Sequence, residues 1–182
     1  MEILDVVDEN GNPTGETVER TVAHKTGVRH RTSHVWVVRK NNGNMEILLQ
    51  KRSKNKDSHP GCLDCSSAGH IPAGVDFIPS AIRELKEELG IDAKEDEFVY
   101  CGQTVGKRTN VFYGEEFIDN QVSNIYYIER NMKADKFNIQ KEELESVVWM
   151  KYDDAVLMVK NNTIPNCVKM EELEMLGKKI NK

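Results

Sequence analysis

The stretch AGHIPAGVDFIPSAIRELKEELGI, residues 68–91, decides the fold because it carries the clearest periodic pattern in the chain. Its apolar residues recur at steps of three and four, the spacing of one buried helix face. The residues of this face are Ile78, Ile82, Leu85 and Leu89. Asp76 is a suitable N-cap, and Gly90 suits a left-handed helix end. The pattern therefore predicts a helix over about residues 77–89.

Three glutamates, Glu84, Glu87 and Glu88, lie on this predicted helix. At about 100° per residue, Glu88 lies roughly 40° from Glu84, and Glu87 roughly 60° on the other side. The three carboxylates are therefore expected to face solvent in one patch beside the buried face. Like charges this close raise one another's pKa unless a cation lies among them, and carboxylates suit Mg²⁺ or Mn²⁺. The alternative is a solvated face with an Arg83–Glu87 ion pair.

The loop before the helix favours the metal interpretation. Gly69 and Gly74 bracket a tight turn, since glycine permits close backbone approach. This turn is expected to bring backbone carbonyl groups, including that of Ala68, close to the helix. A main-chain oxygen would then complete the ligands of a metal held by the carboxylates.

The whole stretch resembles the Nudix box, whose pattern is G-x5-E-x7-R-E-U-x-E-E-x-G-U, with U an aliphatic residue. Gly69 begins the match, RELKEELGI over residues 83–91 completes it, and Val75 stands where the pattern has a glutamate. So many matches at fixed spacing are a specific signal. The resemblance implies an α/β/α sandwich that hydrolyses a nucleoside diphosphate linked to another moiety with the help of a divalent metal.

The resemblance also implies roles for individual residues. Glu84 and Glu88 would hold the metal, Glu87 would assist, and Glu84 or a neighbour would handle the attacking water. Gly69, Arg83 and Gly90 would be structural. Since the missing glutamate mostly orients the box arginine in similar proteins, Val75 threatens the orientation of Arg83 more than it threatens the metal.

Other segments resemble the Nudix branch that contains isopentenyl-diphosphate isomerase. The segments are DENGNPTGETVERTVAHKTGVRHR, LLQKRSKNKDSHPG and CSSAGH. This resemblance implies a second metal site formed by His24, His30, His70 and Asp119. Three imidazoles suit Mn²⁺ or Zn²⁺, and their protonation would release the metal below about pH 6. Each histidine alone is more often structural.

Two departures argue against isomerase activity. The isomerase needs an acid–base cysteine where this chain has Ala68, and alanine cannot move a proton. The isomerase also lacks the full box that this chain retains. Gln121 replaces a carboxylate of the branch, with Glu115 and Glu116 nearby. The losses at Val75 and Gln121 leave open a diphosphate-binding protein without catalysis.

Three further patterns have a functional and an ordinary interpretation. Cys62 and Cys65, with His59 nearby, would start a zinc site, but no second pair follows. A basic run offers Lys51 and Arg52 to a diphosphate, or is simply a solvated loop. The run also contains Lys54 and Lys56. Aromatic residues that would stack on a substrate, or pack in the core, are Trp36, Tyr113 and Phe117.

The composition describes an ordinary soluble chain. Its 182 residues carry a net charge of −5, which disfavours binding to nucleic acid polymers. No apolar run reaches the ~20 residues that span a bilayer, and the N-terminus lacks the features of a signal peptide. Four cysteines are too few for a disulfide scaffold. We therefore expect a cytoplasmic protein without membrane contact, with a homodimer as one option. The resemblance adds a small-molecule diphosphate substrate.

The remaining chain alternates strand and helix patterns. Residues 2–20 and 33–53 indicate two hairpins around Asn-Gly turns, and a loop with one short strand follows. Later strands are expected near residues 97–102, 121–130 and 145–152, before a helix with Asp153 as N-cap and a terminal helix. This order predicts a mixed sheet flanked by helices. Together with the resemblance, it implies one Nudix domain over residues 1–182. Its parts are an N-terminal hairpin extension (residues 1–30) and the box (residues 69–91).

Overall fold

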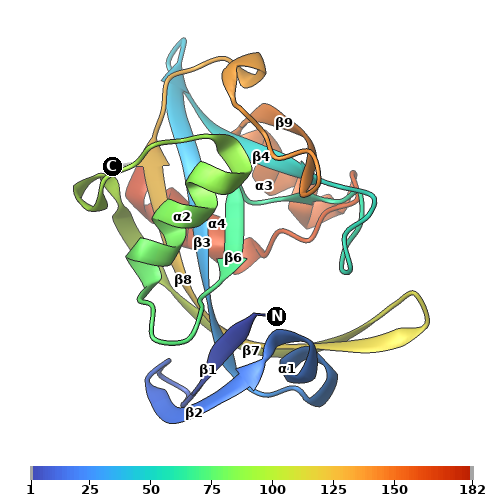
Figure 1. Cartoon of the computed structure of the whole chain (residues 1–182). Coiled ribbons are helices and arrows are strands. Elements are labelled where there is room, and N and C mark those ends of the chain that lie inside the picture. The colour runs from blue at the N-terminus through green and yellow to red at the C-terminus, as the bar shows by residue number, and fades with distance from the viewer. Residues whose placement is uncertain (1, 181–182) are drawn as a thin grey trace.

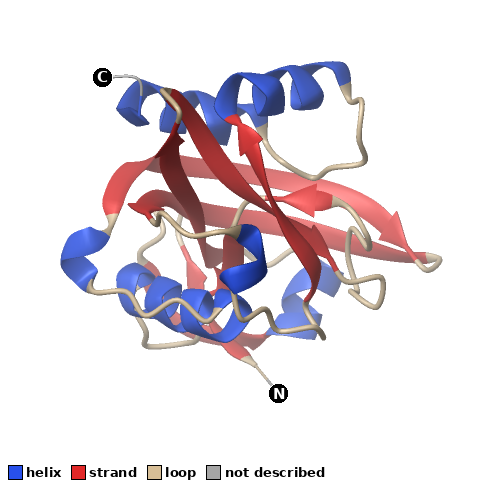
Figure 2. Ribbon diagram, turned by 90° about the horizontal axis from the view of Figure 1, so that it is seen from above, coloured by secondary structure: helices blue, strands red, loops and turns tan. Residues whose placement is uncertain are grey.

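The computed structural model describes residues 2–180 and contains a seven-stranded mixed sheet with helices on both faces (Figures 1 and 2). The α/β/α architecture expected from the sequence is confirmed. The strands are β1 (Ile3–Val7), β2 (Pro13–Glu19), β3 (His30–Asn41), β4 (Asn44–Arg52), β5 (Leu63–Asp64), β6 (Ser67–His70), β7 (Val99–Phe112), β8 (Glu115–Glu129) and β9 (Leu144–Lys151). The helices are α1 (Arg20–Thr26), α2 (Phe77–Leu89), α3 (Tyr152–Asn161) and α4 (Met170–Ile180). No helix among the described residues is long and apolar enough to cross a membrane.

Strand β3 is the centre of the sheet. The strand order is β5-β4-β3-β8-β7, in which β3 and β8 run parallel and the other neighbours are antiparallel. Strand β6 also pairs with β3, and β9 pairs with β4. Strands β7 and β8 form a hairpin longer than the sequence predicts, and its far end extends beyond the body of the molecule in Figure 1.

The two faces of β3 carry two separate cores because side chains alternate along a strand. Val35 and Val37 pack with Leu85 and Leu89 of α2. On the opposite face, Trp36 packs among side chains from α3 and α4. Trp36 is fully buried, so its core interpretation is the right one.

The N-terminal hairpin is present as expected, and β1 pairs with β2 in a separate two-stranded sheet. Its turn contains Gly11 at φ +83°, a conformation that suits glycine. Helix α1 follows, which the sequence pattern did not predict. Seven residues are too short to show a clear period, and the helix is fixed by its contacts with β8 and β2.

Helix α2 has the predicted ends but a different buried face. Asp76 caps its own helix through Phe77 N–H, and Gly90 ends the helix at φ +69°. The fully buried residues are Ser80, Ala81, Leu85, Glu88 and Leu89. Ile78 and Ile82 are only partly buried, so the buried face of the helix is rotated relative to the predicted one. The expectation that Glu88 faces solvent was wrong, since this residue is only 6% exposed.

Two smaller expectations are also corrected. Helix α3 begins at Tyr152 with Lys151 in the N-cap position, so Asp153 lies in the first turn instead. Acidic residues in a first turn interact favourably with the helix dipole, which explains the N-terminal signal at Asp153. The loop after β4 contains two short strands, β5 and β6, where one was expected.

Candidate active site and metal centre

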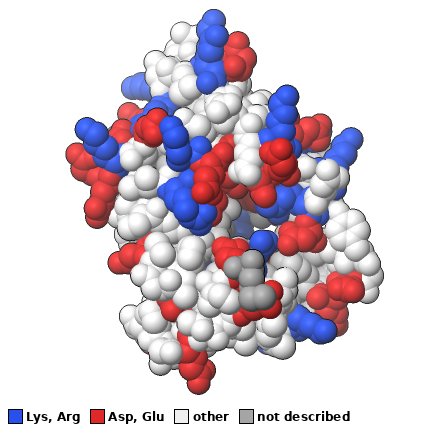
Figure 3. Space-filling view, viewed as in Figure 1, with Lys and Arg blue, Asp and Glu red and all other residues white. Residues whose placement is uncertain are grey.

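A polar cavity of about 580 Å³ opens beside the N-terminal hairpin and helix α2. Its walls come from α1, α2, β3, β6, the loop after β4, the β7–β8 hairpin and the segment before α4. Figure 3 shows acidic and basic side chains around a hollow on this face. The cavity brings together residues that lie far apart in the sequence, so it is the natural place to test the predicted site residues.

All three predicted carboxylates of α2 line this cavity, together with Arg83. Arg83 donates to Glu84 at 2.6 Å and to Glu87 at 2.7 Å. The Arg83–Glu87 pair proposed as the ordinary alternative therefore exists, but it does not account for Glu84 and Glu88. Arg83 is held by carboxylates of its own helix although Val75 supplies none.

Glu88 has no partner that matches its charge. Its Oε2 atom is buried without a hydrogen bond of good geometry, although the neighbouring Ser67 hydroxyl and the charge of Lys56 both act to lower the pKa of Glu88. Burial raises the pKa of Glu88 to about 8, and the nearby charge of Glu84 acts in the same direction. Burial also raises the pKa of Glu84, against the effect of Arg83. Glu84 and Glu88 thus both have raised pKa values, and of the two only Glu84 is paired with an arginine.

The backbone next to this pair leaves room for no side chain. A Cβ atom added to Gly69 would lie 2.3 Å from Cδ of Glu84. Strand β6 therefore approaches the helix so closely that a side chain at position 69 would displace the Glu84 carboxyl group. The close approach to the helix was expected, but Gly69 lies within a strand and not at a turn. Ala68, the preceding residue, lines the same cavity. An unpartnered buried carboxylate oxygen and hard oxygen donors fit a divalent cation of the Mg²⁺ or Mn²⁺ type.

The three predicted histidines also come together. Nε2 of His24 and Nε2 of His70 are 2.9 Å apart, and the ligand atoms of these two residues and His30 lie within 4.8 Å of one another. Asp119 joins them through Nδ1 of His24 at 3.3 Å. Nε2 of His30 is buried without a hydrogen-bond partner. Four residues from four elements, α1, β3, β6 and β8, thus converge as the resemblance implied, and the metal itself stays a prediction.

Burial changes the expected pH behaviour of these imidazoles. It lowers the pKa of His30 to about 4 and holds that of His70 well below its ordinary value. In the unfolded chain these two imidazoles become protonated near pH 6.5, whereas in the folded protein they become protonated only at lower pH. His30 and His70 are therefore neutral, as metal ligands must be, at pH values well below the limit of about 6 expected from free histidines.

We expect His70→Ala to lower the metal content of the purified protein, because one of three converging imidazoles is lost. The measurement is elemental analysis after purification with Mn²⁺ or Zn²⁺ and removal of free metal. His59→Ala is a matched control, because His59 lines the cavity but lies outside the three-histidine cluster. Equal metal content in His70→Ala and the parent would show that the three histidines have a structural role and do not bind the metal.

Gln121 occupies the position where the isomerase-like branch has a second carboxylate. Its side-chain amide donates to Asp119 Oδ1 at 3.1 Å, so it orients Asp119 and adds no charge. Glu115 and Glu116, considered as substitutes, are exposed at the far end of the β7–β8 hairpin and do not line the cavity.

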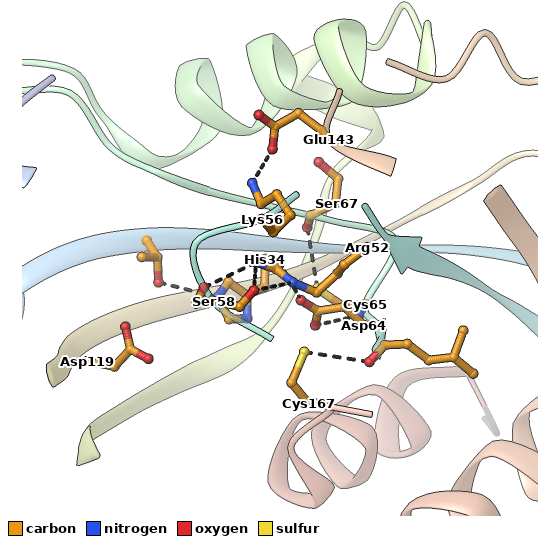
Figure 4. A network of polar contacts seen from close by, with 12 residues as sticks. His34, Arg52, Lys56, Ser58, Asp64, Cys65, Ser67, Asp119, Glu143 and Cys167 are labelled. Atoms are coloured by element: carbon orange, nitrogen blue, oxygen red, sulfur yellow. Dashed lines mark hydrogen bonds and ion pairs between the residues drawn. The ribbon is translucent and has the colours of Figure 1, made fainter. Parts of the chain in front are cut away.

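The two basic residues predicted to bind substrate are separated by the structure. Arg52 lines the cavity, where it donates to Asp64 at 3.2 Å and to the Ser58 carbonyl at 2.9 Å (Figure 4). Lys51 points elsewhere because successive residues of a strand face opposite sides. It pairs with Glu145 at 2.9 Å on the surface, so its assignment to the substrate site was wrong.

Lys56, a member of the same basic run, is a better candidate than Lys51. It lines the cavity and forms an ion pair with Glu143, as Figure 4 shows. Glu143 lies in the segment before β9, and no local motif marks it in the sequence. It is a cavity carboxylate that sequence reasoning missed.

Of the cysteines and aromatic residues considered from the sequence, some line the cavity and others do not. Cys62 and Cys65 are both free thiols, and among the described residues His59 and Cys62 join no metal-type cluster. Cys65 instead lies close to His34 and Glu172. Phe117 stacks on His24 with ring centroids 4.1 Å apart and lines the cavity. Tyr113 is exposed, and its hydroxyl donates to the Lys56 carbonyl.

An α/β/α sandwich whose cavity gathers carboxylates, arginines and lysines is typical of enzymes that act on phosphorylated small molecules. Comparison with known proteins is more specific, because the NUDIX domain family model matches residues 13–168. The chain belongs to the NUDIX domain family.

Its relatives include Nudix hydrolase 3 of Arabidopsis thaliana, 38% identical over 84% of this chain but only 20% of the plant protein. An uncharacterised Nudix hydrolase of Clostridium acetobutylicum is 34% identical over 88% of this chain and 75% of the relative. This chain is thus an enzyme of the Nudix pyrophosphohydrolase class, as the sequence predicted. Nudix hydrolases generally need divalent metal ions.

Solved structures confirm the fold. A Deinococcus radiodurans protein, DR0079, has a TM-score of 0.68 at 16% identity, with 98% of this chain and 99% of that chain covered. The NUDIX domain of Shewanella oneidensis NrtR, solved with ADP ribose, has a TM-score of 0.58 at 14% identity, with 82% and 87% covered. A Caenorhabditis elegans Ap4A hydrolase has a TM-score of 0.54 at 17% identity, with 83% and 97% covered.

Proposed function

We propose that this protein hydrolyses a diphosphate linkage in a nucleoside-diphosphate-type substrate, with Mg²⁺ or Mn²⁺ as cofactor. The observation that carries the proposal is Glu88, a buried carboxylate whose Oε2 lacks a hydrogen bond of good geometry and whose neighbour in the cavity is a second carboxylate, Glu84. Such a pair is costly to bury without a cation and useful with one.

The residues that would hold the cation are Glu84 and Glu88, with Glu87 and the carbonyl oxygen of Ala68 completing the set. When bound, a divalent cation neutralises charge that develops on the diphosphate and makes water a better nucleophile near neutral pH. Gly69 contributes by its lack of a side chain, which lets Glu84 lie against β6. Arg83 orients Glu84 and Glu87 through its two hydrogen bonds.

Hydrolysis forms a bond from water oxygen to one phosphorus and breaks the bond from that phosphorus to the bridging oxygen. The proton that water gives up needs a nearby carboxylate, and Glu84 suits this role because burial raises its pKa. The leaving phosphate takes the bond electrons. Lys56 and Arg52 line the same cavity and would attract the negative charge of the substrate.

The relatives support a nucleotide-type substrate without fixing it. The Caenorhabditis elegans neighbour is named for hydrolysis of Ap4A, and the Shewanella oneidensis domain was crystallised with ADP ribose. The experiment is an assay of ADP-ribose, Ap4A and isopentenyl diphosphate with Mg²⁺ or Mn²⁺, each compared with a chelator control. We expect cation-dependent cleavage of at least one nucleotide and none of isopentenyl diphosphate. Cation-independent cleavage, or none at all, would contradict the proposal.

An isomerase-like function is the second candidate because His24, His30 and His70 converge as that branch of the family implies. Ala68 argues against it, since the cavity there lacks the thiol that would move a proton. Conversion of isopentenyl diphosphate to its allylic isomer in the same assay would favour this second candidate.

A further inference from the structure

His34 is a cavity residue that neither the box nor the three-histidine cluster uses. It lies on the central strand β3, directly opposite Ala68 of β6 in the antiparallel pair. Its side chain is only 13% exposed, and the exposed part borders the cavity. A histidine held on the most buried strand of the sheet, with one edge open to the site, is well placed to contact substrate.

Glu172 fixes the orientation of this histidine. Nδ1 of His34 lies 3.0 Å from both carboxylate oxygens of Glu172, which is 2% exposed and comes from α4. Burial would raise the pKa of Glu172, but His34 and, more weakly, Lys169 hold it below its ordinary value. The carboxylate therefore stays charged and accepts a hydrogen bond from Nδ1–H, which leaves Nε2 as the ring nitrogen on the cavity side.

Nε2 of His34 has room for a better partner. Its nearest hydrogen-bonding atom is Oγ1 of Thr32 at 3.4 Å, and that hydroxyl is already engaged with Ser123 at 2.7 Å. The interaction at 3.4 Å is weak by distance, so the nitrogen would gain from a ligand atom at ordinary hydrogen-bond distance.

The surroundings of His34 in the cavity are polar rather than apolar. Asp64, Thr104, Asn166 and Lys169 line the same cavity. A hydrocarbon chain here would offer no partner to the Thr104 hydroxyl, which is buried without a hydrogen bond, and would displace water from the paired charges of Asp64 and Lys169. A hydroxylated group would instead pair with them.

A metal centre is the competing explanation, because ligand atoms of His34, Cys65 and Glu172 lie within 4.8 Å of one another. The contacts oppose it. The Cys65 thiol is buried and already donates to the Ser67 carbonyl. His34 and Glu172 already satisfy one another.

We propose that His34, oriented by Glu172, is a specificity-determining residue that binds a hydroxylated, sugar-type part of the substrate lying beyond the diphosphate. This inference rests on the proposed function, since it concerns the same cavity. A site built to hydrogen-bond a hydroxyl group rejects analogues that lack it, because its own polar groups are left unpaired. His34 therefore favours sugar-linked diphosphates over isoprenyl diphosphates.

Two substitutions of His34 separate binding from structure. In His34→Asn, the amide nitrogen replaces Nδ1 and keeps the contact with Glu172, but the cavity-side nitrogen is lost. In His34→Gln, the amide nitrogen replaces Nε2, and the contact with buried Glu172 is lost. We measure the melting temperature, KM and kcat with ADP-ribose, and ADP-ribose binding by calorimetry without divalent cation.

We expect His34→Asn to keep the parent melting temperature but to raise KM and the dissociation constant for ADP-ribose about tenfold or more, with a smaller change in kcat. His34→Gln is expected to lower the melting temperature, because Glu172 loses a partner, yet to bind ADP-ribose better than His34→Asn. Parent-like KM and binding in His34→Asn would overturn the proposal and leave the pair a structural role.

Two further results keep this test separate from that of the proposed function. If the parent hydrolyses nothing, the proposed function fails, but weaker ADP-ribose binding by His34→Asn still supports the role of His34. Absence of ADP-ribose binding by the parent, with no turnover, overturns the proposal. So does one equivalent of zinc in the purified protein that Cys65→Ser removes, since His34 would then be a metal ligand.

Discussion

Glu88→Gln is expected to abolish cation-dependent hydrolysis, with a loss of 100-fold or more in kcat, equivalent to about 2.7 kcal/mol in the barrier. Glutamine keeps the size of the side chain but cannot supply the charge that a divalent cation requires. The matched control is Glu87→Gln, the same change on the same helix at a side chain that is 49% exposed and paired with Arg83. We expect the control to lose much less, because Glu87 only assists. Equal losses in the two variants would remove the special role of Glu88.

In the absence of metal, Glu88→Gln is expected to stabilise the fold at high pH, although it abolishes activity. The pKa of Glu88 is raised from 4.5 to about 8 on folding, so the folded state binds more protons than the unfolded chain between these values. The metal-free parent therefore loses stability as the pH rises from about 4.5 to 8, by an amount on the order of a few kcal/mol. Glu88→Gln cannot ionise and escapes this loss. Thermal melts in chelator at pH 6 and pH 9 should show a smaller decrease for the variant, and parallel decreases would refute the burial argument.

Gly69→Ala is the second substitution with a large expected effect. The new Cβ would lie 2.3 Å from Cδ and 2.4 Å from Oε1 of Glu84, so the carboxylate must move away from β6. The backbone of Gly69 does not require a left-handed conformation, so the effect acts through Glu84 rather than through backbone strain. We expect a loss of roughly 10- to 100-fold in kcat/KM, on the order of 1.4–2.7 kcal/mol, and loss of stabilisation by Mg²⁺.

Gly106→Ala is the control for cation binding and stability. Gly106 also lies in a strand without a left-handed backbone, but a Cβ atom there would meet nothing within 4 Å. Its response to Mg²⁺ in a thermal melt should match that of the parent. Normal stabilisation by Mg²⁺ in Gly69→Ala would show that Glu84 tolerates the displacement and is not held in place by β6.

Both ends of α2 could be predicted from the sequence, because Asp76 and Gly90 cap the helix through contacts with their immediate neighbours. Which face of the helix is buried depends on what packs against it, and periodicity counts a glutamate as polar. Glu88 was therefore placed in solvent, although the approach of β6 buries it. The error concerns the residue that matters most for the site, since its burial raises its pKa.

Residues brought together by the sheet were predictable only where a family resemblance supplied the pattern. His24, His30 and His70 belong to three segments, and their convergence followed from the resemblance. His34 and Glu172 are separated by 138 positions, and no spacing rule links them. Lys51 and Arg52 are adjacent in the sequence, yet strand alternation sends only Arg52 into the cavity.

The most direct test of the central claim is calorimetric titration of Mg²⁺ into the metal-free parent at pH 7, in two buffers that differ in ionisation enthalpy. Mg²⁺ is used because it prefers oxygen ligands, whereas Mn²⁺ also suits the three-histidine cluster. A site formed by Glu84 and Glu88 must deprotonate Glu88, whose pKa is about 8, before the cation binds. The difference between buffers should therefore correspond to release of about one proton per cation, and Glu88→Gln should not bind. Tight binding without proton release, or equal binding by Glu88→Gln, would show that the cation lies elsewhere and that the carboxylates of α2 are not its site.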